Sequence, residues 1–106
     1  MFTIDAFNGL YASLAEARAV LRFDGNVQVA KVLSSGVGRV REHSDYGAAD
    51  GITEKVYALE ADLPAAAAVG KEVEISVSGG AWIRSRIEGM KTTAGVVAVT
   101  LRNDNA

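Results

Sequence analysis

The stretch that decides the fold is residues 71–102, KEVEISVSGGAWIRSRIEGMKTTAGVVAVTLR. Apolar and polar residues alternate along KEVEISV and AWIRSRIE, which is typical of strands with one buried face and one solvated face. Glycine-bearing segments, SGG and GMKTTAG, separate the runs. The stretch therefore predicts three consecutive antiparallel strands joined by turns.

The first turn of this meander decides which residues face each other. A three-residue loop at 78–80, with glycine in the left-handed conformation, places Ile75 opposite Ile83. A two-residue loop would set Ile75 against Arg84 instead, and the apolar row would meet a charged one. We therefore predict the three-residue loop. It also pairs two glutamates with two arginines, Glu74 with Arg84 and Glu72 with Arg86.

Composition indicates one folded domain without reactive thiols. The chain has 106 residues, is 49% hydrophobic and contains a single proline. It has no cysteine, which excludes disulfides, thiolate catalysis and thiolate zinc sites.

Its net charge is -2 with both signs mixed, so no overall field attracts nucleic acid or anionic lipid. The start of the chain lacks the pattern of a secretory signal and no apolar run approaches a membrane span, so we expect an aqueous, cytoplasmic protein.

Residues 5–23 predict an amphipathic N-terminal helix. Its apolar face recurs at helical spacing and consists of Phe7, Leu10, Leu14, Ala17 and Leu21. We expect this face to cover the sheet, and the alternative is a face reserved for another subunit.

The segment between the helix and the meander predicts further strands and one long loop. The strand that starts after Gly25 has an apolar row interrupted by Lys31, which requires a bulge or an edge position. The other expected elements are a short strand at 37–41, a long exposed loop at 42–51, a central strand at 52–61 and a helical turn at 63–69. We therefore predict a single α+β domain over residues 1–106. It is mostly β, with a helix at 5–23 and an antiparallel barrel or sandwich of five or six short strands at 26–102.

No motif predicts catalysis, a cofactor or a metal. The glycines of 36–41 lack the third glycine and the helix of a dinucleotide loop, and Gly70-Lys71 lacks the Ser or Thr that a phosphate loop needs. His43 with Asp45 or Asp50 is the one set that could serve as acid, base or metal ligand, and a solvated loop is favoured over it. We predict a protein that is not an enzyme and takes no small-molecule substrate.

A basic aromatic strip offers nucleic-acid binding as an alternative. Trp82, Arg84, Arg86 and Arg102 are of the types that small barrels use for single strands. Glu72 and Glu74 face two of the arginines in the predicted register, and a second hairpin over 88–96 would place Trp82 opposite Arg102. These pairings favour a structural role for the strip.

The order of helix, strand, long loop, strand, helical turn and three-strand meander resembles small head-tail joining proteins of long-tailed bacteriophages, and the lambda-type head-tail connector family in particular. The likeness lies in KVYALEAD, LPAAAAVGKEVEIS, GGAWIRSRIEGM and VVAVTLR, and it covers roughly residues 25–102. The N-terminal helix departs from it.

The resemblance implies a structural protein that docks at the portal vertex, forms a ring and presents a surface to the tail. Its partners would be other copies of itself, portal or connector proteins and tail proteins, in the virion and in the host bacterial cytoplasm during assembly. A tail terminator or tail-completion protein is the alternative within the same class. A ring needs heterologous contacts, and Tyr46 is the expected loop anchor. The candidate interface residues are Lys31, Glu42, His43, Asp45, Tyr46 and Asp50.

Overall fold

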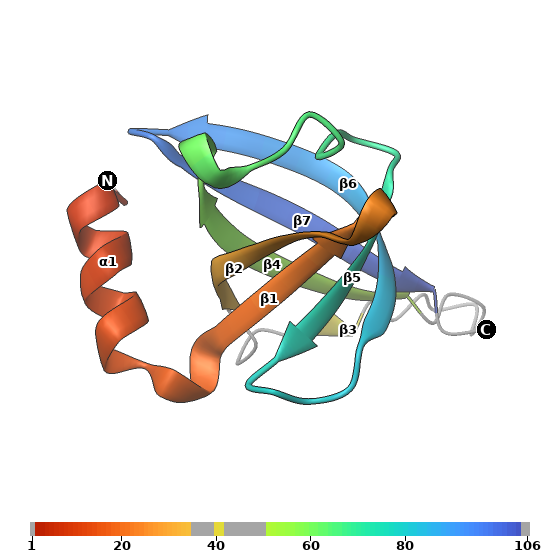
Figure 1. Ribbon diagram of the computed structural model, residues 1–106, viewed down its shortest axis with the longest axis horizontal. Coiled ribbons are helices and arrows are strands. Elements are labelled where there is room, and N and C mark those ends of the chain that lie inside the picture. The colour runs from red at the N-terminus through yellow and green to blue at the C-terminus, as the bar shows by residue number, and fades with distance from the viewer. Residues whose placement is uncertain (1, 35–39, 42–50, 105–106) are drawn as a thin grey trace.

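The computed structural model describes residues 2–34, 40–41 and 51–104 (Figure 1). The elements in this part of the chain are α1 (Ile4–Ser13), β1 (Arg18–Phe23), β2 (Val27–Ser34), β3 (Val40–Arg41), β4 (Gly51–Leu59), β5 (Glu72–Val77), β6 (Ile83–Thr93) and β7 (Val96–Asp104). Short 3-10 turns occupy Ala15–Ala17, Asp24–Asn26 and Glu60–Asp62.

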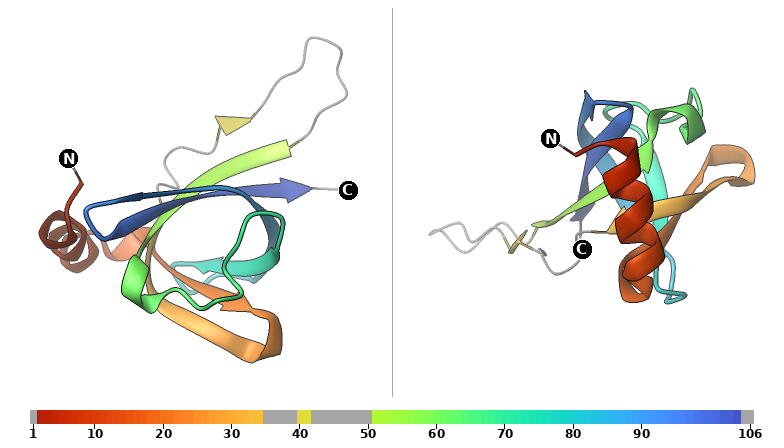
Figure 2. Two further views of the ribbon diagram at one scale, coloured as in Figure 1. Left: turned by 90° about the horizontal axis from the view of Figure 1, so that it is seen from above. Right: turned by 90° about the vertical axis from the view of Figure 1, so that its left-hand side faces the viewer.

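Six antiparallel strands close into a barrel. The strand order is β2-β1-β5-β6-β7-β4, and β2 also pairs with β4, so the first and last strands of the sheet meet. Val32, Leu33 and Ser34 make this closing contact opposite Ala58, Tyr57 and Val56. Strand β3 adds a short pairing on the edge of β4. The left view of Figure 2 shows the strands wrapped around a common centre. The predicted mostly β fold with an N-terminal helix is confirmed, and it is a barrel and not a sandwich.

The barrel interior is filled by apolar side chains that alternate along the strands. The largest fully buried members are Leu21, Val32, Val56, Ile75, Ile87, Val97, Val99 and Leu101. Burial of each such side chain stabilises the fold by about 1.5–3 kcal/mol. Leu63, Ala66 and Ala67, from the connection between β4 and β5, pack against this core from outside the strands.

The register predicted for the first hairpin of the meander is confirmed. Ile75 lies opposite Ile83, and the two glutamate–arginine pairs face each other as expected. The loop differs in detail, because β5 ends at Val77 and β6 begins at Ile83. Ser78 and Gly79 both have positive φ, 52° and 73°, and Gly80 N–H donates to the Val77 carbonyl over 2.9 Å. This tight turn has the paired left-handed residues that hairpins favour.

The predicted facing of Trp82 and Arg102 is wrong. Strands β6 and β7 meet at a two-residue turn, Ala94-Gly95, and Arg102 lies opposite Arg86. The cause is that β6 continues through Lys91, Thr92 and Thr93, part of a segment interpreted from its glycines as a turn. Threonine favours strands, so the turn begins only at Ala94. A bulge between Ile87 and Gly89 shifts the register once more.

The predicted helix over 5–23 is also wrong beyond its first half. Helix α1 begins after Thr3, whose hydroxyl accepts the Ala6 N–H over 3.2 Å, and it ends at Ser13. Residues 18–23 form β1, which pairs with β2 on one side and β5 on the other. Ala19, Leu21 and Phe23 are buried in the barrel core, with the period of two that defines a strand.

Of the two explanations predicted for Lys31, a bulge or an edge position, the structure shows the bulge. Ala19 pairs with Val32 while Leu21 pairs with Val29, so two residues of β2, Ala30 and Lys31, lie opposite one residue of β1. This extra residue moves Lys31 out of the apolar row and lets Val29 and Val32 both face the core.

The strand predicted at 52–61 is β4, and it is central, as expected. Strand β7 pairs with one of its edges, and β2 and β3 pair with the other. The helical turn predicted at 63–69 is not formed, because the helical part of the connection from β4 to β5 is Glu60–Asp62 and residues after it make only isolated turns.

Helix α1 packs on the outside of the barrel through a second apolar cluster. Phe7 is fully buried there together with Leu33 of β2 and Val96 of β7. The right view of Figure 2 looks at the molecule from the side of α1 and shows the helix in front of the barrel strands. Ile4 extends the contact to the turn between β6 and β7, where it lies against Gly95.

Replacement of Gly95 by alanine is expected to lower the free energy of unfolding by about 1–2 kcal/mol, because a left-handed φ disfavours any side chain. Gly95 has φ 81°, and an added Cβ would lie 2.7 Å from Ile4 Cδ1. Urea denaturation followed by circular dichroism measures the change. Gly9→Ala in α1 is the control, since Gly9 has open space around it and alanine favours the helix. A loss no larger than that of the control would contradict this account of the turn.

Candidate assembly surface

An apolar groove lies between α1 and the outer surface of the barrel. Its volume is about 380 Å³, and it is lined by Phe2, Leu10, Leu14, Ala17, Leu33, Ser34 and Tyr57. Leu10 and Leu14 keep 41% and 39% of their surfaces exposed. Phe7 and Tyr11 form the row of α1 that faces the barrel, so the neighbouring leucine row is left open to solvent. The predicted helix face thus covers the sheet only in part.

Lys31 ties α1 to the bulge of β2. Its Nζ donates to Asn8 Oδ1 over 2.5 Å and lies 5.8 Å and 5.5 Å from the ring centroids of Phe7 and Tyr11. Tyr11 also donates its hydroxyl to the Ala30 carbonyl, over 3.4 Å. An ammonium over aromatic rings is attracted to their π faces. Lys31 therefore fixes the position of the helix that borders the groove.

Arg18 fixes the C-terminal turn of α1. Its Nε donates to the Tyr11 carbonyl over 2.7 Å, and its Nη2 donates to the Ala12 carbonyl over 3.1 Å. These carbonyls belong to the last turn of the helix, where no backbone N–H of the helix can reach them. The guanidinium also lies 5.1 Å from the Tyr11 ring centroid. Because α1 is held at its middle by Lys31 and at its C-terminal turn by Arg18, the groove is preformed.

Ser34 places a polar atom in the wall of this apolar groove. The residue is 5% exposed, and its Oγ has no hydrogen-bond partner among the described residues. A buried hydroxyl without a partner costs about 1–3 kcal/mol. The groove therefore combines a mainly apolar lining with the buried hydroxyl of Ser34.

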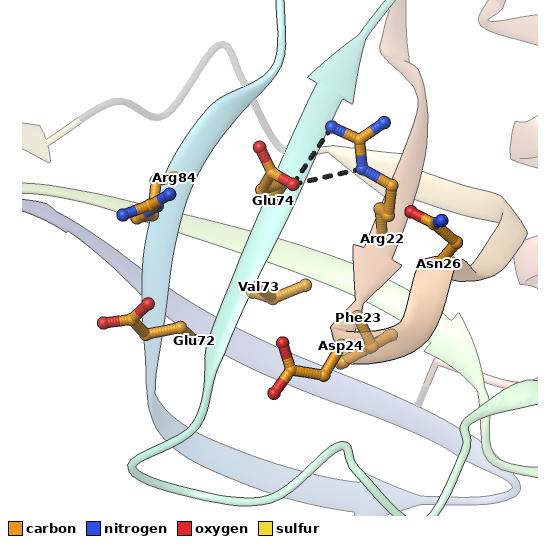
Figure 3. Close-up of a pocket in the computed structure, with 8 residues that line it drawn as sticks. All are labelled: Arg22, Phe23, Asp24, Asn26, Glu72, Val73, Glu74 and Arg84. Atoms are coloured by element: carbon orange, nitrogen blue, oxygen red, sulfur yellow. Dashed lines mark hydrogen bonds and ion pairs between the residues drawn. The ribbon is translucent and has the colours of Figure 1, made fainter.

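The outer face of β1, β5 and β6 forms a second, charged surface, shown in Figure 3. Arg22 points to Glu74, with Nη2 and Nε at 3.0 Å and 3.1 Å from Oε1, and Arg84 lies on the far side of that carboxylate. A polar pocket of about 170 Å³ opens between these strands. The Arg22 guanidinium also lies 4.0 Å from the Trp82 ring centroid. The indole predicted to stack on bases or on Arg102 is thus covered by Arg22.

The remaining arginines of this face have acidic neighbours as well. Arg86 lies 3.6 Å from Glu72, and Arg102 lies 3.6 Å from Glu88. These pairs are largely exposed, so each contributes about 0–1 kcal/mol. Arg84, Arg86 and Arg102 border a pocket of about 120 Å³ together with Glu72. The face alternates charge and does not present a continuous basic strip.

The structure places one of the predicted interface residues, Lys31, at the contact between β2 and α1. The other five, Glu42, His43, Asp45, Tyr46 and Asp50, lie outside the described residues, so their role stays a prediction. Within the described residues no group of three or more His, Cys, Asp or Glu side chains is arranged to hold a metal ion. The same part of the chain contains no helix with the length and apolarity of a membrane span.

The preferred sequence interpretation missed the groove, because it buried Leu10 and Leu14 against the sheet with the rest of the apolar face, whereas the alternative of a face reserved for another subunit leaves them open. The only signal for the groove was that α1 carries two apolar rows, one through Phe7 and Tyr11 and one through Leu10 and Leu14, more than one contact line can bury.

Fold and surface together define a class: a small closed antiparallel β-barrel with a helix docked on its outside and an open apolar groove beside that helix. No protein-family model, curated protein or solved structure matches the chain.

Proposed function

We propose that the protein is a non-enzymatic structural adaptor of a bacteriophage or prophage, which joins head to tail at the portal vertex and assembles as a ring. The observation that carries this proposal is the preformed groove beside α1, because an open apolar surface on a small domain marks a contact with another protein. The kind of assembly is inferred from the sequence segments that resemble lambda-type head-tail connectors, KVYALEAD, LPAAAAVGKEVEIS, GGAWIRSRIEGM and VVAVTLR.

The barrel suits the geometry of a ring. A ring is built from heterologous contacts, in which one face of each subunit meets a different face of the next. A closed barrel keeps such faces at fixed relative positions, since its strands are paired around the whole circumference. The proposed partners are other copies of this chain, the portal complex above it and tail proteins below it.

The alternatives have less support. A tail terminator or tail-completion protein would use a similar ring at the neighbouring layer, so only the stage of assembly separates it from a head-proximal adaptor. Nucleic-acid binding through Trp82, Arg84 and Arg86 is disfavoured because Arg22 stacks on the indole and Glu72 pairs with Arg86.

Disruption of the gene in the phage or prophage that carries it tests the proposal. Electron microscopy of the lysate is expected to show DNA-filled heads and separate tails of normal length. Tails of abnormal length would assign the protein to tail termination instead, because an uncapped tube keeps growing. Joined, infectious particles in the absence of the gene would contradict both assignments.

Plasmid copies sharpen this experiment. A plasmid copy of the intact gene is expected to restore joined particles. A copy that encodes Leu14→Glu is expected to fail, because a carboxylate in the groove would have to be buried for an apolar contact to form. Asp24→Ser is the control, because Asp24 is exposed and borders the charged pocket rather than the groove. Equal rescue by both variants would show that the groove has no part in joining.

A further inference from the structure

We propose that the loop tip at residues 68–70 of one copy inserts into the groove beside α1 of the next copy, with Val69 as the apolar anchor. This inference rests on the ring assembly proposed above and specifies its subunit contact.

Val69 is held outward on a well-anchored loop. It is 61% exposed, the highest value among the large hydrophobic side chains of the described residues. On one side of it, Ala66 and Ala67 pack against the barrel core, and Ala67 N–H donates to the Pro64 carbonyl over 3.0 Å. On the other side, Gly70 N–H donates to the Ile87 carbonyl over 2.8 Å. The loop is therefore fixed at both ends, and little conformational entropy is lost when it binds.

The loop and the groove match in polarity. Residues 63–70, LPAAAAVG, carry no charged side chain, and none of the residues that line the groove is charged. The residues on either side of the anchor, Ala68 and Gly70, are small, so the loop backbone can approach the groove closely. The exposed aromatic candidate, Trp82, is less free to insert because Arg22 lies 4.0 Å from its ring centroid.

The two surfaces also complement each other in hydrogen bonding. Ser34 Oγ is buried in the groove, it has no partner in the described part of the chain, and a hydroxyl can donate or accept. The backbone N–H and C=O of Val69 take part in none of the turn hydrogen bonds among the described residues. Insertion of Val69 would bring a free backbone group to the Ser34 hydroxyl.

The positions of the two surfaces agree with a ring. In Figure 1, α1 lies at the left, while the green to teal connection between β4 and β5 runs over the top of the barrel toward the right. The surfaces are therefore different faces of the subunit. A contact between two different faces is heterologous, so it repeats from copy to copy instead of closing as a symmetric dimer.

Cysteine cross-linking tests the contact, because the natural chain contains no cysteine. The double variant Leu10→Cys/Val69→Cys is expected to give a ladder of multimers on a non-reducing gel after mild oxidation. An equal mixture of the Leu10→Cys and Val69→Cys single variants is expected to give one heterodimer and no larger species. Both sites are exposed, so neither change is expected to unfold the protein, and circular dichroism confirms this.

A matched control uses Asp24→Cys, an exposed position outside the groove and the loop, in place of Val69→Cys. Leu10→Cys/Asp24→Cys is expected to give no ladder. A ladder as strong as that of the test pair, or no ladder from the test pair, would overturn the proposed contact. Dimers of Leu10→Cys alone that outnumber the heterodimer would also overturn it, in favour of a groove-to-groove dimer.

These outcomes separate the contact from the proposed function. If gene disruption leaves heads and tails unjoined and the test pair gives no ladder, the adaptor function stands and the contact is wrong. If the test pair gives a ladder and particles are complete without the gene, the contact stands and the adaptor function is wrong.

Discussion

Replacement of Phe7 by alanine is expected to lower the free energy of unfolding by about 3–5 kcal/mol, the range for large-to-small changes of buried aromatic residues. Phe7 is fully buried and joins α1 to Leu33 and Val96 on the outside of the barrel. Its ring lies edge-on to Phe2, with centroids 6.3 Å apart, and stacks on Tyr11 at 6.2 Å. The change removes the only fully buried side chain of α1, so the helix is expected to detach.

Urea denaturation followed by circular dichroism measures this loss, and amide hydrogen exchange shows whether α1 opens before the barrel. Phe7→Leu is the conservative control, because leucine refills part of the cavity and is expected to cost less. A loss below about 1 kcal/mol for Phe7→Ala would contradict the docking of α1 on the barrel.

Replacement of Leu21 by alanine is expected to cost about 2–5 kcal/mol, since Leu21 is 1% exposed at the centre of the barrel core. It lies on β1 between Val29 of β2 and Ile75 of β5, so the cavity would open where two strand pairs meet. The same denaturation experiment measures the change.

Leu14→Ala is the informative comparison for Leu21→Ala. In a continuous helix over 5–23 the two leucines would lie about two turns apart on one face, and both changes would cost similar amounts. Leu14 is instead 39% exposed at the edge of the groove. Its replacement is expected to cost less than about 1 kcal/mol at concentrations where the protein is a monomer. Equal losses at the two positions would contradict the placement of Leu21 in a strand.

The meander could be predicted because its signals are local. Alternation in residues 72–77 and 83–87, with glycines between them, sets the pairing of Ile75 with Ile83 without help from the rest of the chain. The irregularity at Lys31 was predictable for the same reason, because a lysine within an apolar row requires a bulge or an edge position, and the structure has the bulge.

The helix boundary could not be predicted, because Ala17 and Leu21 satisfy a helical period while Ala19, Leu21 and Phe23 satisfy a strand period. The choice is made by partners far away in the sequence, such as Glu74, which bonds Arg22 of β1. Non-local strand pairing overrides local propensity here. The position of the turn at Ala94-Gly95 is also set by non-local pairing. Thr92 and Thr93 pair with β7, so β6 extends to Thr93 and the turn begins after it.

The groove could not be predicted from the sequence, because it depends on how α1 is rotated on the barrel. Lys31 and Arg18 set that rotation through contacts with Asn8 and with the last helical carbonyls. These contacts are side-chain hydrogen bonds between different elements, and the hydrophobic periodicity of a sequence does not reveal such bonds. The exposure of Leu10 and Leu14 follows from this placement.

The most direct test of ring assembly at the portal is the mass of the purified protein in solution. Light scattering over a wide concentration range, first alone and then with a candidate portal complex, is expected to show closed multimers or a monomer that assembles on the portal. A protein that stays a monomer at every concentration and ignores the portal complex would contradict the proposed ring.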